Sequence, residues 1–120
     1  MQAQLRGKTI LVVEDEFLVG ADLRSMLEQI GAGVLGPIDN ATAAVAAAFD
    51  SKVDGALLDI KIGNTTVEPI AEVLVQRKLP FILVSGLPHE GVPQALRVAP
   101  YLAKPVRKAS LTALASALFI

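Results

Sequence analysis

The sequence predicts an α/β protein in which five parallel strands form one doubly wound sheet. Short apolar runs alternate five times with stretches of helical spacing, and this alternation implies crossover helices on both faces of a parallel sheet. The chain has 120 residues, of which 52% are hydrophobic and 19% charged, so it can bury a core of its own. We therefore expect residues 1–120 to form a single domain with the common strand order 2-1-3-4-5.

The first part of the chain supplies two β–α units. Residues 9–13 form an apolar, β-branched run that is typical of a strand buried on both faces. Apolar residues then recur at helical spacing over residues 16–30, and glycines end that helix. A short strand at residues 34–35 follows, and Asn40 is expected to cap an alanine-rich helix at residues 41–49.

The middle of the chain repeats this order. Residues 55–58 form a third apolar run, and residues 61–66 are polar enough to predict a loop. Residues 67–78 place their apolar side chains at helical spacing. A proline interrupts this pattern before residues 81–84, which predict the fourth strand.

The segment that follows the fourth strand is punctuated by glycine and proline. Residues 86–98 therefore predict a reduced or mobile fourth helix, with at most one or two turns near residues 93–98. Residues 100–103 predict the fifth strand, and a final helix is expected over residues 110–118.

Polar residues follow four of the five predicted strands. Glu14, Asp15 and Glu16 follow the first strand, Asp59 the third, Ser85 the fourth and Lys104 the fifth. The carboxyl ends of parallel strands share one edge, and the first and third strands are neighbours at the switch point where ligands bind. We therefore expect the carboxylates, the hydroxyl and the ammonium group to meet in one crevice.

This set of side chains predicts phosphoryl chemistry with a metal ion. Crowded carboxylates repel one another, and Mg²⁺ prefers such oxygen ligands. A metal and a lysine can neutralise phosphoryl oxygens while a carboxylate attacks the phosphorus. Any one of these residues taken alone is equally consistent with a solvated loop residue. The prediction therefore depends on finding suitable side chains at four strand ends on the same edge of the sheet.

The composition argues against several other classes of function. The net charge of −1 gives no basic surface for a nucleic acid, and no apolar run is long enough to span a membrane. The chain has no cysteine, and its single histidine, His89, is expected to be a loop residue without a role. The first residues do not resemble a signal peptide, so we expect a cytoplasmic protein.

The chain resembles the receiver domain of two-component response regulators. The similarity covers residues 8–119 and depends on four segments taken together, because each alone is weak. These segments are residues 10–16 (ILVVEDE), 57–59 (LLD), 84–86 (VSG) and 101–105 (YLAKP). The resemblance implies a CheY-like, flavodoxin-like fold. The residues in these motifs also resemble those of an alphaproteobacterial subset of receivers that occurs with HWE-type sensor kinases and in the general stress response.

The resemblance implies a role for each site residue. Asp59 would accept a phosphoryl group from a histidine kinase or a phosphotransfer protein in a phosphorelay. The implied ligands of Mg²⁺ are Glu14, Asp15, Asp59 and the backbone carbonyl of Lys61. The other implied positions are the phosphoryl-binding Ser85 and Lys104, the switch residue Tyr101 and the cis-proline Pro105.

The implied activity is limited to one residue of the chain itself. Such a domain is not an enzyme acting on a released substrate, since it catalyses only the transfer and loss of its own phosphoryl group. Phosphorylation would switch the surface near the fifth strand and the last helix. The output partner stays unidentified, a second copy of the chain is a candidate partner, and the chain is either a stand-alone receiver or part of a longer protein.

The sequence departs from the usual receiver pattern in four places. Glu14 stands where aspartate is usual, which lengthens one metal-binding arm and keeps its charge. Residues 60–64 lack the usual Met-Pro turn, and Val106 replaces a frequent phenylalanine. The connection between Ser85 and Lys104 is several residues short.

Three alternative functions use a similar fold. A haloacid-dehalogenase-type phosphatase needs a second acid two residues after its nucleophile, where this chain has Lys61. A flavin-binding protein would need phosphate donors after the first strand, where Glu14 and Asp15 would repel phosphate. The main alternative is a pseudo-receiver that binds proteins without phosphorylation. Loss of an acid or of Lys104 would favour it, and none of these residues is missing.

Overall fold

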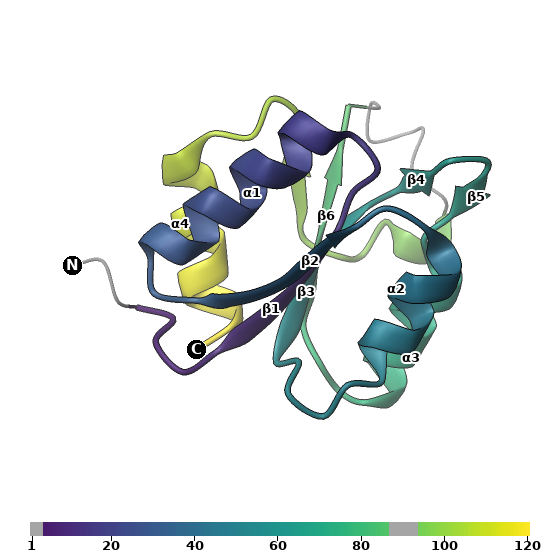
Figure 1. Cartoon of the computed structure of the whole chain (residues 1–120), viewed down its shortest axis with the longest axis horizontal. Helices are drawn as coiled ribbons and strands as arrows, with labels where there is room; N and C mark the ends of the chain where they lie inside the picture. The colour runs from purple at the N-terminus through teal and green to yellow at the C-terminus, as the bar shows by residue number, and fades with distance from the viewer. Residues whose placement is uncertain (1–3, 87–93) are drawn as a thin grey trace.

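A parallel sheet lies between two pairs of helices in the computed structural model, which describes residues 4–86 and 94–120 (Figure 1). The strands of the sheet are β1 (Thr9–Val13), β2 (Gly33–Ile38), β3 (Gly55–Asp59), β6 (Phe81–Ser85) and β7 (Tyr101–Ala103). The helices are α1 (Phe17–Gln29), α2 (Ala41–Ala48), α3 (Glu68–Gln76) and α4 (Lys108–Leu118). The order β2-β1-β3-β6-β7, with every pair parallel, confirms the predicted order 2-1-3-4-5.

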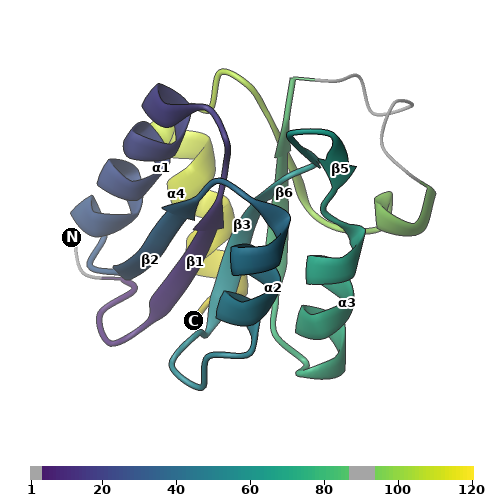
Figure 2. The same cartoon turned by 45° about the vertical axis from the view of Figure 1, so that its right-hand side comes forward.

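Alternate residues of the central strands pack against different helix pairs. In β1, Ile10 and Val12 lie in the core under α1 and α4, whereas Leu11 and Val13 lie in the core under α2 and α3. Figure 2 shows α2 and α3 together on one side of the sheet, away from α1 and α4. Burial on both faces explains why these strands are continuous apolar runs rather than alternating ones.

The second strand is longer than its pattern predicts. The expected strand covered residues 34–35, whereas β2 extends to Ile38 and includes Pro37. β2 lies at the edge of the sheet, where a proline without an N–H group is tolerated. Gly36 has φ +113°, and a Cβ there would lie 2.5 Å from the carbonyl oxygen of Val12, so only glycine fits beside β1.

Residues 61–66 were expected to form a loop, and the structure instead has a small hairpin there. β4 (Lys61–Ile62) pairs antiparallel with β5 (Thr65–Thr66), outside the main sheet. Gly63 makes the turn with φ +59°, and the side chain of Ile62 is buried. Two-residue strands are too short to show a period, so the sequence pattern could not reveal them.

The connection from β6 to β7 contains little helix in its described part. Within residues 86 and 94–100, the helical element is the single turn η2 (Gln94–Leu96), which agrees with the turn expected near residues 93–98. Residues 87–93, which include His89, lie outside the described residues. None of the described helices is both long enough and apolar enough to cross a membrane.

The expected cap of the second helix is confirmed. The side-chain oxygen of Asn40 accepts a hydrogen bond of 2.8 Å from the backbone N–H of Ala43. This bond satisfies one of the N–H groups that a helix start leaves without an intrahelical partner. The last helix begins two residues earlier than predicted, at Lys108.

Candidate functional site

Three carboxylates meet at the carboxyl edge of the sheet, as the strand order requires. Glu14 and Asp15 directly follow β1, and Asp59 is the last residue of the neighbouring strand β3. One oxygen from each carboxylate lies within 4.8 Å of the other two. Glu14 is 2% exposed and Asp59 8% exposed, whereas Asp15 is open to solvent.

Lys104 brings a positive charge to these carboxylates. Its Nζ atom lies 3.0 Å from Glu14 Oε1, 2.8 Å from Glu16 Oε1 and 3.5 Å from Asp59 Oδ2. The shortest of these contacts is a hydrogen bond to Glu16, which stands at the rim of the site with an exposed side chain. In this structure the ammonium group therefore lies between the buried acids and the rim.

The surroundings of Asp59 favour its protonated form. Its pKa is raised from 3.8 to about 7, first by burial and then by a hydrogen bond with Glu14 and the charges of Glu14 and Asp15. Lys104 acts in the opposite direction but does not cancel it. A positive charge added beside Asp59 would favour the carboxylate form.

The surroundings of Lys104 favour its charged form. Burial alone would lower its pKa, but the hydrogen bond to Glu16, the close contact with Glu14 and the charges of Asp59 and Glu14 together outweigh burial. The pKa of Lys104 therefore lies above its ordinary value, and the side chain carries a full positive charge at neutral pH.

The ends of β6 and β7 are joined beside the acids. Ser85 is buried at the end of β6, and its backbone carbonyl accepts a hydrogen bond of 2.9 Å from the N–H of Lys104. The half-buried Tyr101, at the start of β7, donates its hydroxyl to the same carbonyl at 3.4 Å. The peptide bond between Lys104 and Pro105 is cis. Ser85, Tyr101 and Lys104 thus form one connected group.

The small hairpin completes the site. The backbone N–H of Gly63 donates a 2.8 Å hydrogen bond to Asp15 Oδ2. Lys61 and Gly63 line an open cleft of about 360 Å³ together with Asp59 and Lys104. The sequence assigned no role to Gly63, and no sequence signal could have given one, because this contact uses only its backbone. Glu16 also had no assigned role, although the run of three acids at residues 14–16 marked its position.

The donor atoms fit a hard divalent cation such as Mg²⁺. Carboxylate oxygens are the ligands that this ion prefers in proteins. Glu14 Oε1 is buried and accepts no well-oriented hydrogen bond from the described residues, although the ammonium of Lys104 lies 3.0 Å away. Three carboxylates this close together repel one another, and the single ammonium of Lys104 balances only part of their charge. The acid cluster therefore suits a metal ion better than it suits an anion.

Comparisons with known proteins find their matches among solved structures. The chain is 38% identical to the signal receiver domain of a modulated diguanylate cyclase from Desulfovibrio desulfuricans G20, with 92% of each chain covered and a TM-score of 0.79. It is 33% identical to the BeF3-activated conformation of SdrG from Pseudomonas melonis Fr1, with 98% and 99% covered and a TM-score of 0.76. No protein-family model and no curated protein matches the chain.

A third structure carries a metal ion. It is the receiver domain of a sensor histidine kinase from Pseudomonas aeruginosa PAO1 with a magnesium ion coordinated in its active-site cleft. The two chains are 23% identical, 94% and 98% of them are covered, and the TM-score is 0.76, so this likeness shows the fold alone.

The similarity to SdrG agrees with the alphaproteobacterial subset expected from the sequence.

Proposed function

The chain belongs to the receiver domains of two-component response regulators, and from this membership we propose that Asp59 accepts a phosphoryl group from a histidine kinase or a phosphotransfer protein. The observation that carries this proposal is the grouping at Asp59. Its carboxylate shares one cluster with Glu14 and Asp15, and Lys104 Nζ lies 3.5 Å from it. A buried nucleophile is thus accompanied by the acids and the cation that phosphoryl transfer requires.

The acids would hold Mg²⁺ during the transfer. We propose Glu14, Asp15 and Asp59 as carboxylate ligands and the carbonyl of Lys61 as a backbone ligand. Bound Mg²⁺ would supply positive charge that favours ionised Asp59 and neutralises phosphoryl oxygens. The 2.8 Å hydrogen bond from the N–H of Gly63 would hold Asp15 in position for this role.

In the proposed step, a carboxylate oxygen of Asp59 attacks the phosphorus in line. The new oxygen–phosphorus bond forms as the phosphorus–nitrogen bond of the donor phosphohistidine breaks, and the electron pair stays on the imidazole nitrogen. Lys104 leaves Glu16 and pairs with a phosphoryl oxygen. Ser85 would bind another phosphoryl oxygen through its hydroxyl.

The switch would pass from Ser85 to the surface beside it. Tyr101 already contacts the carbonyl of Ser85, so a movement of Ser85 changes the position that Tyr101 prefers. The affected surface would include β7 and α4. Receiver domains are generally signalling modules rather than enzymes, which fits an activity confined to one residue of the chain.

Intact mass after incubation with acetyl phosphate and Mg²⁺ tests the proposal. We expect one added phosphoryl group in the natural chain, dependent on Mg²⁺, and none in Asp59→Asn. A folded protein that takes up no phosphoryl group and whose melting temperature does not respond to Mg²⁺ would contradict the proposal. That result would favour the pseudo-receiver, which binds a partner without phosphorylation.

A further inference from the structure

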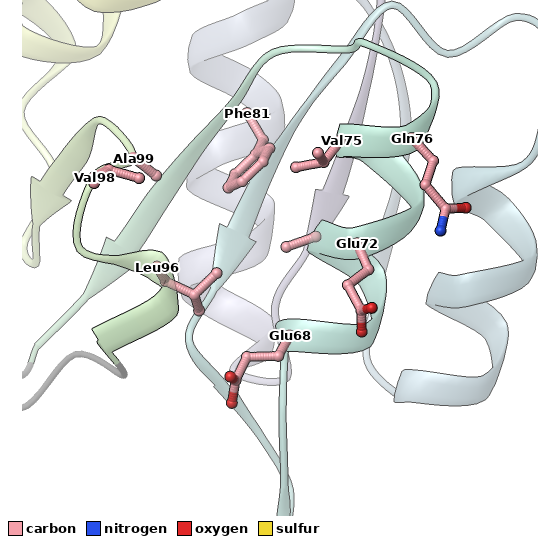
Figure 3. A pocket seen from close by; sticks show the side chains of 9 residues that line it. Glu68, Glu72, Val75, Gln76, Phe81, Leu96, Val98 and Ala99 are labelled. Atoms are coloured by element: carbon pink, nitrogen blue, oxygen red, sulfur yellow. The ribbon is translucent and has the colours of Figure 1, made fainter.

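A second hollow lies on the opposite side of α3 from α2 and away from the acid cluster. It has a volume of about 580 Å³ and lies between α3 and the segment that carries η2 (Figure 3). Val75 of α3 lines one wall, Leu96 and Val98 line the other, and the half-buried ring of Phe81 lies between them. We call this hollow the α3 groove.

The walls of the α3 groove expose apolar side chains. Val75 is 63% exposed and Val98 is 94% exposed, whereas Leu96 is buried at 5%. Facing apolar side chains around a partly open hollow are a common feature of protein-binding sites. The groove is thus shaped to receive apolar side chains from outside.

Among the described residues that line the groove, the two charged side chains are both acidic. Glu68 and Glu72 lie one turn apart on α3, where like charges repel weakly. Glu68 accepts a hydrogen bond of 3.2 Å from the hydroxyl of Thr66, and within residues 4–86 and 94–120 neither glutamate forms an ion pair. No cation of the described residues neutralises these two charges, so both carboxylates can pair with a cation on a partner.

We propose that the α3 groove docks a short amphipathic helix of a partner protein, with apolar anchor residues flanked by Lys or Arg. The apolar walls would take the anchors, and Glu68 and Glu72 would pair with the basic side chains. An added strand is disfavoured, because β6 behind the groove is already paired with β3 on one side and β7 on the other. A second copy is disfavoured too, because a symmetric contact would place the two acidic rims together.

Fluorescence anisotropy with three labelled peptides of equal length tests this proposal on the unphosphorylated full chain. The first peptide carries leucines at helical spacing flanked by lysines. The second has glutamates in place of the lysines, and the third has serines in place of the leucines. We expect only the first to bind, and binding to weaken as salt is added.

Variants of the groove locate the binding site. Glu68→Gln combined with Glu72→Gln should weaken binding of the first peptide about threefold to tenfold. Val75→Asp should weaken it at least as much, with Val75→Ser used if the aspartate variant does not fold. Glu28→Gln is the matched control, since Glu28 lies on α1 and pairs with Arg24, and it should leave binding unchanged.

Other results would overturn the proposal. These results are no binding by any peptide, equal binding of the acidic peptide, or equal binding by the groove variants. Sedimentation that shows a dimer abolished by Val75→Asp would assign the groove to a second copy instead. Because no phosphoryl group is present in these experiments, their outcome is independent of the phosphorylation of Asp59.

Discussion

At the scale of single residues, Lys104 makes its shortest contact with Glu16 and is also held by Glu14 at 3.0 Å. The ammonium lies 2.8 Å from this rim carboxylate but 3.5 Å from Asp59, the residue it is proposed to assist. Lys104 would have to exchange Glu16 for a phosphoryl oxygen during the reaction. The exposed charge of Glu16 would also repel an anionic phosphodonor at the mouth of the cleft.

Glu16→Gln should therefore accelerate phosphorylation. With acetyl phosphate and saturating Mg²⁺, we expect a rate about twofold to fivefold higher, because Lys104 loses its contact with Glu16 and the donor is repelled less. The measurement is the time course of intact mass, with Glu28→Gln as the control for the loss of one exposed charge. An unchanged or slower rate would show that Glu16 does not restrain Lys104.

The sequence predicted which side chains meet at the edge of the sheet, but it did not predict which of them contact one another. Asp59 and Lys104 could be located because each follows a strand, and strand ends meet at a known edge of a parallel sheet. The partner of Lys104 could not be predicted, since three carboxylates lie within its reach. Gly63 and Asp15 are 48 positions apart in the sequence, and their contact forms only because the hairpin folds back over the acid cluster. The donor is a backbone N–H group, which every residue except proline carries, so the sequence contains no pattern that predicts the contact.

At the scale of elements, the end of α4 is fixed by a close approach to β3. Phe119, just after α4, is 2% exposed and packs directly on Gly55. A Cβ on Gly55 would lie 2.6 Å from Phe119 Cδ1 and 3.2 Å from the carbonyl oxygen of Pro80. The glycine at the start of β3 is thus required by packing.

Gly55→Ala should destabilise the protein by about 1–3 kcal/mol, the usual cost of overpacking a core. Urea unfolding followed by circular dichroism measures this change. Gly33→Ala is the matched control, because a Cβ at that strand position has its nearest contact at 3.6 Å. Equal stabilities of the two variants would show that Phe119 moves away at little cost.

The sequence predicted the bounds of an element where its helical pattern extended over enough residues. The alanine helix and its Asn40 cap were predicted because eight helical residues and a capping side chain both leave clear signals. β2 was predicted too short, because its continuation through Pro37 depends on pairing with β1 and on its edge position. Propensity alone cannot report either condition.

At the scale of the whole molecule, the acid cluster links stability to pH. Asp59 has a pKa of about 7 in the folded protein and 3.8 as its ordinary value. Between these values the folded state holds a proton that the unfolded state has released. Stability from this group is therefore complete below about pH 3.8 and is lost as pH rises to 7.

Asp59→Asn removes this titration and should be more stable than the natural chain in EDTA. We expect its advantage to grow between pH 5 and pH 8 by on the order of 1–2 kcal/mol, because only the natural chain must ionise a buried acid. Urea midpoints of both proteins at each pH measure the difference. A constant difference would contradict the raised pKa, whereas added Mg²⁺ should reduce the difference at pH 8.

The two edges of the sheet restrict how this molecule can associate. On β2, Pro37 offers no N–H group, and the carbonyl oxygen of Gly36 is occupied by Arg24 Nη1 at 2.7 Å. The other edge, β7, has only three residues. Neither edge is a good template for a further strand. This protects the chain against aggregation by strand pairing between molecules. We therefore expect assembly with other proteins to use helices, loops and grooves, where side chains rather than backbone groups decide the choice of partner.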